Sequence, residues 1–115
     1  MEYRLLYITA PTPDEARRIA RELVERRLVA CANIVPSIES IYWWDGEVQS
    51  GAEALLLAKT KAELVPHVID AVRELHSYAC PCIVSLPIEQ GFAPFLQWIG
   101  DETLPADRQE EDDLK

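Results

Sequence analysis

Glycine and long apolar runs are scarce in this chain, and each shortage excludes a class of protein. Four glycines occur among 115 residues, and neither a Gly-x-Gly-x-x-Gly nor a Walker sequence is present, so we expect no glycine-rich phosphate cradle. The longest apolar stretches, such as residues 54–58, fall far short of the roughly 20 residues that span a membrane. The first residues also lack the basic region, apolar core and cleavage site of a signal peptide. We therefore expect a protein that stays in the cytoplasm.

Basic residues are in the minority. Eleven lysines and arginines stand against twenty aspartates and glutamates, which gives a formal net charge of −9. Nucleic acids are bound through basic surfaces, so we expect no nucleic-acid partner. Acidic residues accumulate at the end of the chain, where residues 107–113 show no apolar pattern. We predict one domain over residues 1–104 and an acidic, disordered tail over residues 105–115.

Cysteine is present in a small, odd number, at Cys31, Cys80 and Cys82. A secreted disulfide scaffold has an even set at wider spacing, and neighbours two apart on a strand are poorly placed for a bridge. Iron–sulfur clusters generally take four cysteines. We therefore expect reduced thiols in a reducing compartment.

The apolar residues that are present follow strand and helix periods in alternation. Residues 3–9 predict a strand, and Thr12 to Glu15 form a capping box with proline at the first helical position. An apolar stripe at helical spacing follows the capping box. Residues 28–44 predict a strand pair or one bent strand, because Pro36 interrupts an apolar run.

The middle of the chain carries a hairpin pattern. Asp45-Gly46 lies between two β-prone segments, which is a strong hairpin signal, and residues 47–59 form the return strand. The Ser50-Gly51 pair within that strand predicts a bulge or kink.

A second capping box runs from Thr60 to Glu63 and precedes another apolar stripe. Pro66 falls past the first turn of such a helix, so either the helix starts near Val65 or its opening turn is irregular. Residues 82–86 then predict a strand ended by Pro87, and residues 93–99 predict a short helix.

The predicted order is β-α-β-β-α-β with a short C-terminal addition, which is the ferredoxin-like α+β arrangement. Two helices would cover one face of an antiparallel sheet and leave the other face open. Residues 55–57 and 41–44 place apolar groups on both faces of their strands, whereas a strand with one wet face alternates. Burying each large side chain contributes about 1.5–3 kcal/mol. We expect another copy of the chain to cover the open face, with Tyr42, Trp43, Trp44 and Trp98 as core and interface anchors.

An ordered set of short segments resembles the CutA family of divalent-cation tolerance proteins. These segments are residues 30–34 with Pro36, Ser40, Tyr42, Trp44 and Gly46, then Lys59-Thr60, residues 76–81, residues 86–88 with Gly91, and residues 96–99. The resemblance implies a compact homotrimer with edge strands paired between subunits, similar to PII signalling proteins. It also implies a role in tolerance to copper and other divalent cations, because some members of the family bind copper.

Two segments depart from the family's pattern. Ser77 replaces a proline of the usual His-Pro-Tyr-Glu-x-Pro-Glu segment, and Ala79 and Cys82 stand where acids are usual. Thr9 stands near the end of the first strand, where some copper-binding relatives carry a cysteine. The resemblance therefore implies the fold and the assembly, but this chain lacks some of the side chains that the family's pattern has in these two segments.

His76, Cys80 and Cys82 are the cluster with metal-ligand chemistry. Imidazole and thiolate suit copper or zinc, and two cysteines two apart on a strand would point to the same face. The alternative is that both thiols are small buried hydrophobes and that His76 simply ends a helix. Cys31 lies in an apolar strand and is expected to be inert unless His67 or His76 activates it.

The sequence therefore favours a cytoplasmic homotrimer that binds or senses a divalent metal ion, copper among the candidates, without catalysis. A small-molecule-binding signalling trimer, an enzyme that works in clefts between subunits, and a purely structural scaffold are the alternatives.

Overall fold

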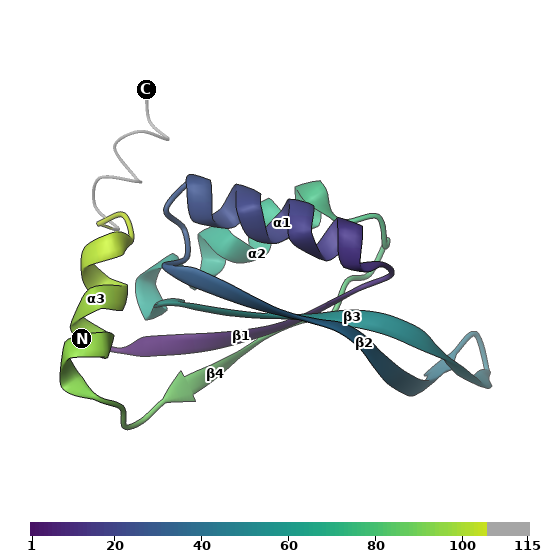
Figure 1. The fold of residues 1–115 in the computed structure, drawn as a ribbon. Helices are drawn as coiled ribbons and strands as arrows, with labels where there is room; N and C mark the ends of the chain where they lie inside the picture. Colours follow the sequence, from purple (N-terminus) through teal and green to yellow (C-terminus); the bar gives the residue numbers. More distant parts are fainter. Residues whose placement is uncertain (106–115) are drawn as a thin grey trace.

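The structure, a computed structural model, describes residues 1–105, so the predicted acidic tail lies outside the described residues apart from Pro105. The elements in chain order are β1 (Tyr3–Ala10), α1 (Pro13–Glu25), β2 (Cys31–Trp44), β3 (Glu47–Lys61), a 3₁₀ turn (Ala62–Leu64), α2 (Val65–Leu75), β4 (Ile83–Ile88) and α3 (Ala93–Glu102) (Figure 1). The strands form one antiparallel sheet in the order β2-β3-β1-β4. The predicted βαββαβ order with a C-terminal helix is confirmed.

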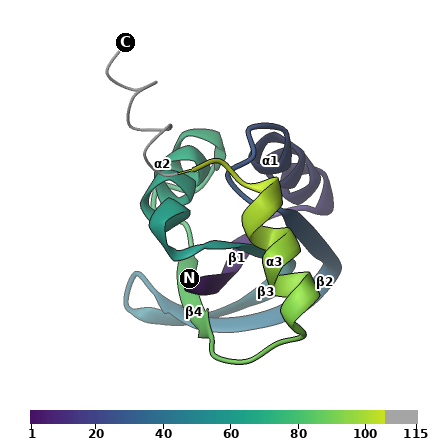
Figure 2. The same cartoon turned by 90° about the vertical axis from the view of Figure 1, so that its left-hand side faces the viewer.

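Helices α1 and α2 lie side by side on one face of the sheet (Figures 1 and 2). Alternate residues of the two central strands point into the space between the layers, as the period of a strand requires. The fully buried side chains there include Leu6 and Ile8 of β1, Leu56 of β3, Ile19 and Leu23 of α1, and Val68 and Val72 of α2. This apolar layer holds the helices on the sheet and fixes the positions of their ends.

The capping box at the start of α1 is half formed. The Thr12 hydroxyl oxygen accepts a hydrogen bond from the backbone N–H of Glu15 at 3.1 Å, as predicted. The Glu15 carboxylate accepts instead from Ser77, far along the chain.

Strand β2 is one bent strand, and its bend lies at Pro36. Val35 pairs with Leu55 and Ile38 pairs with Glu53, so two residues of β2 oppose one residue of β3. This β-bulge follows from Pro36, which has no N–H to give to the ladder. The bulge predicted at Ser50-Gly51 is wrong, because the pairing with β2 is regular there.

The hairpin between β2 and β3 turns at Asp45 and Gly46, as predicted. Both residues have positive φ, 54° and 79°, which matches the turn whose twist suits a two-residue hairpin. The far part of this hairpin, residues 38–53, extends beyond the helical layer (Figure 1). We call this part the arm.

The second capping box is wrong. Thr60 belongs to β3, where it pairs with Arg4 of β1, and its buried hydroxyl donates to the backbone oxygen of Leu28 at 2.6 Å. Helix α2 begins at Val65 with Pro66 in its first turn. The alternative start near Val65 is therefore confirmed, because the sheet ladder and the buried hydrogen bond keep Thr60 in the strand.

Strand β4 begins at Ile83, one residue later than predicted, and continues through Pro87. Proline is tolerated there because β4 is an edge strand, whose outer side has no ladder to satisfy. Helix α3 covers the predicted residues 93–99 and extends to Glu102.

The second face of the sheet is apolar, as the sequence predicts. The pairing register places on it Leu5 and Tyr7 of β1, Val35 of β2, Leu55 and Leu57 of β3, and Val84 and Leu86 of β4. We call this set the open face, because α1 and α2 both lie on the opposite side (Figure 1). Val84 and Leu86 remain 50% and 45% exposed.

Candidate functional site

A buried polar cluster lies after the C-terminal end of α2, with His76 at its centre. The His76 side chain is completely buried, and its Nε2 lies 2.7 Å from the backbone oxygen of Thr9. A carbonyl oxygen only accepts, so Nε2 carries the proton and Nδ1 accepts from the backbone N–H of Tyr78 at 3.0 Å. Both ring nitrogens therefore have partners within the protein.

Glu15 supplies the negative charge of the cluster. Its carboxylate accepts from the backbone N–H of Ser77 at 3.0 Å and from the Ser77 hydroxyl at 2.9 Å, and it lies 3.4 Å from Nδ1 of His76. Burial alone would raise the pKa of Glu15. The two hydrogen bonds from Ser77, together with the charge of Arg18, outweigh burial and hold the pKa of Glu15 below its ordinary value of 4.5.

Tyr78 connects the cluster to the base of the arm. Its hydroxyl donates to the Glu53 carboxylate at 3.1 Å, and its ring centroid lies 4.8 Å from that of His76. Burial, followed by the nearby Glu53 carboxylate, raises the pKa of Tyr78 to about 12. Side chains from α1, from β3 and from the segment after α2 thus meet at one place.

The predicted metal ligands differ in their burial, because the His76 side chain is buried and the thiols of Cys80 and Cys82 are exposed. Cys80 and Cys82 are exposed and lie in the irregular segment between α2 and β4, so their predicted place on a strand is wrong. The alternative of buried thiols is also wrong. His76 does end α2, since its backbone N–H donates to the Val72 oxygen at 2.8 Å.

No group of three or more His, Cys, Asp or Glu side chains within residues 1–105 is placed to hold a metal ion. A site that uses His76, Cys80 and Cys82 together would require the segment 77–82 to rearrange. That site stays a prediction.

Cys31 lies half-buried at the start of β2, next to a cation. The Lys59 ammonium is 3.8 Å from its sulfur and donates to the Asn33 amide oxygen at 2.8 Å. The polar neighbour of the Cys31 thiol is therefore Lys59. The sequence itself offers His67 and His76 as the residues that could activate this thiol.

Glu15, His76 and Ser77 are the residue types of a hydrolase triad, but their connections differ from one. In a triad the hydroxyl donates to the imidazole and the carboxylate orients the ring. Here the Ser77 hydroxyl donates to Glu15, and Nε2 of His76 faces a backbone oxygen. This arrangement holds the segment 77–82 in place and has no activated nucleophile.

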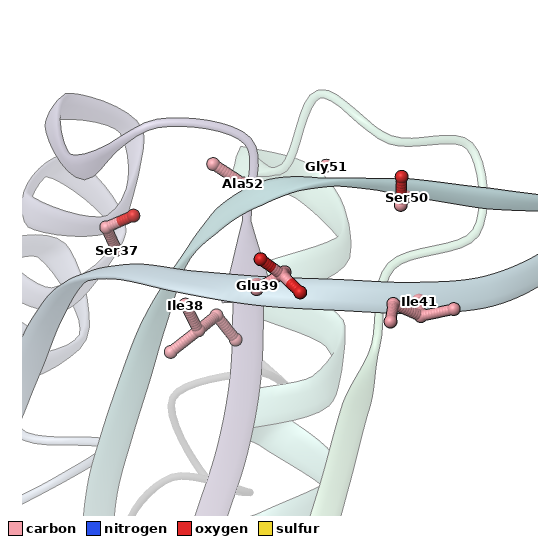
Figure 3. Close-up of a pocket in the computed structure, with 7 residues that line it drawn as sticks. All are labelled: Ser37, Ile38, Glu39, Ile41, Ser50, Gly51 and Ala52. Atoms are coloured by element: carbon pink, nitrogen blue, oxygen red, sulfur yellow. The ribbon is translucent and has the colours of Figure 1, made fainter.

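A shallow hollow of about 500 Å³ lies on the arm (Figure 3). It is lined by Ser37, Ile38, Glu39, Ile41, Ser50, Gly51 and Ala52, from both strands of the arm and the bulge. Four of the seven lining residues are Ser, Gly or Ala. The hollow therefore exists because the side chains around it are small.

The sequence did not point to Glu15 or Glu53 as members of the cluster. Glu15 was assigned to the capping box by its spacing from Thr12, and nothing local marks its contact with Ser77, 62 positions away. A contact between residues this far apart becomes visible only when α1 and α2 are packed on the sheet.

Two helices on one face of a four-stranded antiparallel sheet, in the order β2-β3-β1-β4, define a ferredoxin-like α+β subunit. Residues 4–102 match the family model described as CutA1 divalent ion tolerance protein, and the chain belongs to this family.

Relatives from distant organisms match most of this chain. The divalent-cation tolerance protein CutA of Archaeoglobus fulgidus is 46% identical over 102 residues, which cover 89% of this chain and 98% of that protein. A solved CutA structure from the same organism matches with a TM-score of 0.85 at 43% identity, over 87% of this chain and 97% of that one. The chloroplastic protein CutA 1 of Oryza sativa is 39% identical over 99 residues, and these cover 86% of this chain and 56% of that protein.

The relatives differ in compartment. The Archaeoglobus fulgidus structure is described as periplasmic and the rice protein as chloroplastic. Within residues 1–105, none of the helices has the length and apolar character needed to cross a bilayer. Membership of the family therefore does not fix the compartment of this chain.

Proposed function

We propose that this chain acts in tolerance to divalent metal ions as a homotrimer that binds or senses the metal and does not catalyse a reaction. The observation that carries the proposal is the match of residues 4–102 to the divalent ion tolerance family. The hydrogen-bond connections of Glu15, His76 and Ser77 support binding over catalysis, because they leave no activated nucleophile.

The open face supports the homotrimer. Within residues 1–105, no helix covers its apolar side chains, and the sheet ends in two unpaired edges, β2 and β4. Free edges and an apolar face are natural surfaces for another copy. Sedimentation of the wild-type chain should give a mass three times 13.0 kDa, and a chain that stays folded and monomeric at micromolar concentration would refute the homotrimer.

Copper is the metal we propose, with the exposed thiols of Cys80 and Cys82 as ligands. Thiolates are soft ligands that favour Cu(I). His76 would join them only if its Nε2 gave up the bond to Thr9. The three free thiols also support a reducing compartment, and we propose the cytoplasm.

Titration of the reduced protein with Cu(I) tests this proposal. The wild type and the control variant Cys31→Ser should bind with the same stoichiometry, whereas the double variant Cys80→Ser, Cys82→Ser should lose the tight site. Tight binding that survives in the double variant would refute the thiol ligands, and no binding by the wild type would refute copper as the metal.

A further inference from the structure

Two thiols lie one residue apart on the surface of the molecule. Cys80 and Cys82 are both exposed and free, with Pro81 between them. On an extended strand, residues two apart are about 6.6 Å apart along the chain, near the upper limit for the Cα atoms of a disulfide. This objection to a bridge does not apply here, because both cysteines lie in the irregular segment between α2 and β4 and the chain bends at Cys80 (Figure 1).

The two ends of this segment are held, and its middle can adjust. At one end Ser77 donates two hydrogen bonds to Glu15. At the other end the Cys82 backbone oxygen accepts from the N–H of Thr9 at 3.4 Å. Within the described part of the chain, residues 79–81 make no backbone hydrogen bond. A small change of backbone there brings the two sulfurs together without breaking a bond.

The third thiol is too distant to compete. Cys31 pairs with Lys59, and the register continues across β1 to Leu86 of β4, three strand spacings away. Cys82 lies four residues before Leu86 along the line of β4. With about 4.8 Å between strands and about 3.3 Å per residue, the Cα atoms of Cys31 and Cys82 are about 20 Å apart. A disulfide needs Cα atoms within about 7 Å, so within one copy Cys80 and Cys82 can bond only to each other.

We propose that Cys80 and Cys82 form a thiol–disulfide exchange site that reacts with the disulfide of a small thiol, of which glutathione disulfide is the type. The thiolate of one cysteine attacks a sulfur of glutathione disulfide, which forms a mixed disulfide and releases one glutathione as its thiolate. The thiolate of the other cysteine then attacks the protein sulfur of the mixed disulfide. The bond between Cys80 and Cys82 forms and the second glutathione leaves. The two cysteines lose two protons and two electrons, and glutathione disulfide gains them.

The bond formed in this way is reversible. It closes a small ring over a single residue, and both sulfurs are exposed. Strained or exposed disulfides are the labile ones, whereas structural disulfides resist reduction. The site therefore rests as the dithiol when reduced glutathione is in excess, and it closes when the share of glutathione disulfide rises.

Oxidation of this site would also control the metal site, and this consequence rests on the proposed function. The thiolate is the form of cysteine that binds a metal ion. A bond between Cys80 and Cys82 leaves neither sulfur as a thiolate, so the closed form lacks the Cu(I) ligands proposed above. The exchange reaction itself requires no metal.

Mass spectrometry of the full, metal-free chain tests the exchange. The reduced protein is treated with glutathione disulfide, its remaining thiols are alkylated, and its intact mass is measured. The wild type should lose the mass of two hydrogen atoms and retain one thiol that can be alkylated, Cys31. The control variant Cys31→Ser should lose the same mass and retain none. Dithiothreitol should restore the reduced mass in both.

Single variants separate the two steps of the reaction. Cys80→Ser and Cys82→Ser should each stop at the mixed disulfide and gain the mass of one glutathione, because the second thiol is missing. Both positions are exposed, so we expect both variants to fold, and circular dichroism checks this. A wild-type chain that keeps glutathione attached, or that forms disulfides between copies in place of the internal bond, overturns the proposal.

The exchange site and the proposed function fail in different ways. If the internal disulfide forms but the reduced chain binds no Cu(I), copper is refuted and the exchange site stands. If the reduced chain binds Cu(I) through both thiols but glutathione disulfide never closes them, the exchange site alone is overturned. Where both hold, the oxidised wild type should lose the tight Cu(I) site and regain it after reduction.

Discussion

Two hydrogen bonds join Glu15 to Ser77, one from the backbone N–H at 3.0 Å and one from the hydroxyl at 2.9 Å. Glu15 belongs to the first turn of α1, whereas Ser77 follows the end of α2. The contact therefore ties the two helices together at the end of the molecule where the arm begins.

Replacing Glu15 by glutamine keeps the size of the side chain and removes its charge. Hydrogen bonds to a charged acceptor are stronger than those to a neutral one, so we expect a loss of about 1 kcal/mol in the free energy of unfolding at pH 7. The folded-state pKa of Glu15 lies below 4.5. Its charge thus stabilises the fold above that pH, and the contribution disappears as the pH falls through the folded-state pKa.

Chemical unfolding of both proteins at one protein concentration, repeated from pH 7 to acid, measures this difference. The gap between wild type and Glu15→Gln should close on acidification. If the difference in the free energy of unfolding stayed constant with pH, the negative charge of Glu15 would not be the source of the stabilisation. Glu25→Gln, at an exposed position on the same helix, should change stability by a few tenths of a kcal/mol at most.

Tyr78 should titrate at unusually high pH. Its phenolate would form beside the Glu53 carboxylate in a partly buried site, and the pKa of Tyr78 is raised to about 12. Glu53→Gln should lower that pKa toward the ordinary 10.0 without reaching it, because burial persists. Ultraviolet absorbance of the phenolate follows the titration, and Tyr78→Phe identifies its step. An unchanged pKa in Glu53→Gln would contradict the assigned contact.

Of the two glycines in the arm, Gly46 and Gly51, only Gly46 should be sensitive to replacement by alanine. Gly46 has φ of +79°, a conformation that costs other residues about 1–2 kcal/mol. Gly51 has no such φ, and an added Cβ would meet nothing within 4 Å. Gly46→Ala should therefore destabilise the hairpin by about 1 kcal/mol, whereas Gly51→Ala should be neutral or slightly stabilising. Equal effects in thermal unfolding would contradict the assigned turn.

Adjacent leucines of β3 should have different roles. Leu56 is completely buried under the helices, so Leu56→Ala should cost about 2–5 kcal/mol of subunit stability. Leu57 lies on the open face, and Leu57→Ala should weaken assembly more than it weakens the subunit fold. Unfolding curves at several protein concentrations separate the two effects. If Leu57→Ala destabilised the subunit more than Leu56→Ala did, the assignment of Leu56 to the core and Leu57 to the open face would be contradicted.

Much of the fold was predictable because its signals are local. The Asp45-Gly46 turn, the Thr12 cap and the apolar periods of the strands each act within a few residues. The open face was also predictable, since strands with apolar residues at successive positions cannot have a wet side. These features depend on neighbours along the chain and need no knowledge of packing.

The errors arose where packing overrides a local pattern. Thr60 and Glu63 have the spacing of a capping box, but a ladder to β1 and a buried bond to Leu28 keep Thr60 in β3. Pro87 would end a central strand, but β4 is at the edge. Strict alternation counted from the start of β2 would also assign Tyr42 to the wrong face, because the extra residue at the bulge shifts the count by one.

The sequence shows the residue types of the predicted metal site but not their arrangement, and the site itself stays a prediction. Imidazole and thiol groups at His76, Cys80 and Cys82 are visible in the sequence. Whether they converge depends on the backbone of the segment 77–82, which in turn depends on Glu15 and Glu53 from other elements. No pattern in the sequence marks such partners.

Each free edge of the sheet is interrupted by a proline, Pro36 in β2 and Pro87 in β4. An unbroken edge is a template for cross-β growth, in which strands of successive molecules add without limit. A residue without an N–H group limits the length over which such growth could proceed at either edge. The two prolines therefore oppose the growth of fibrils from either edge of the sheet.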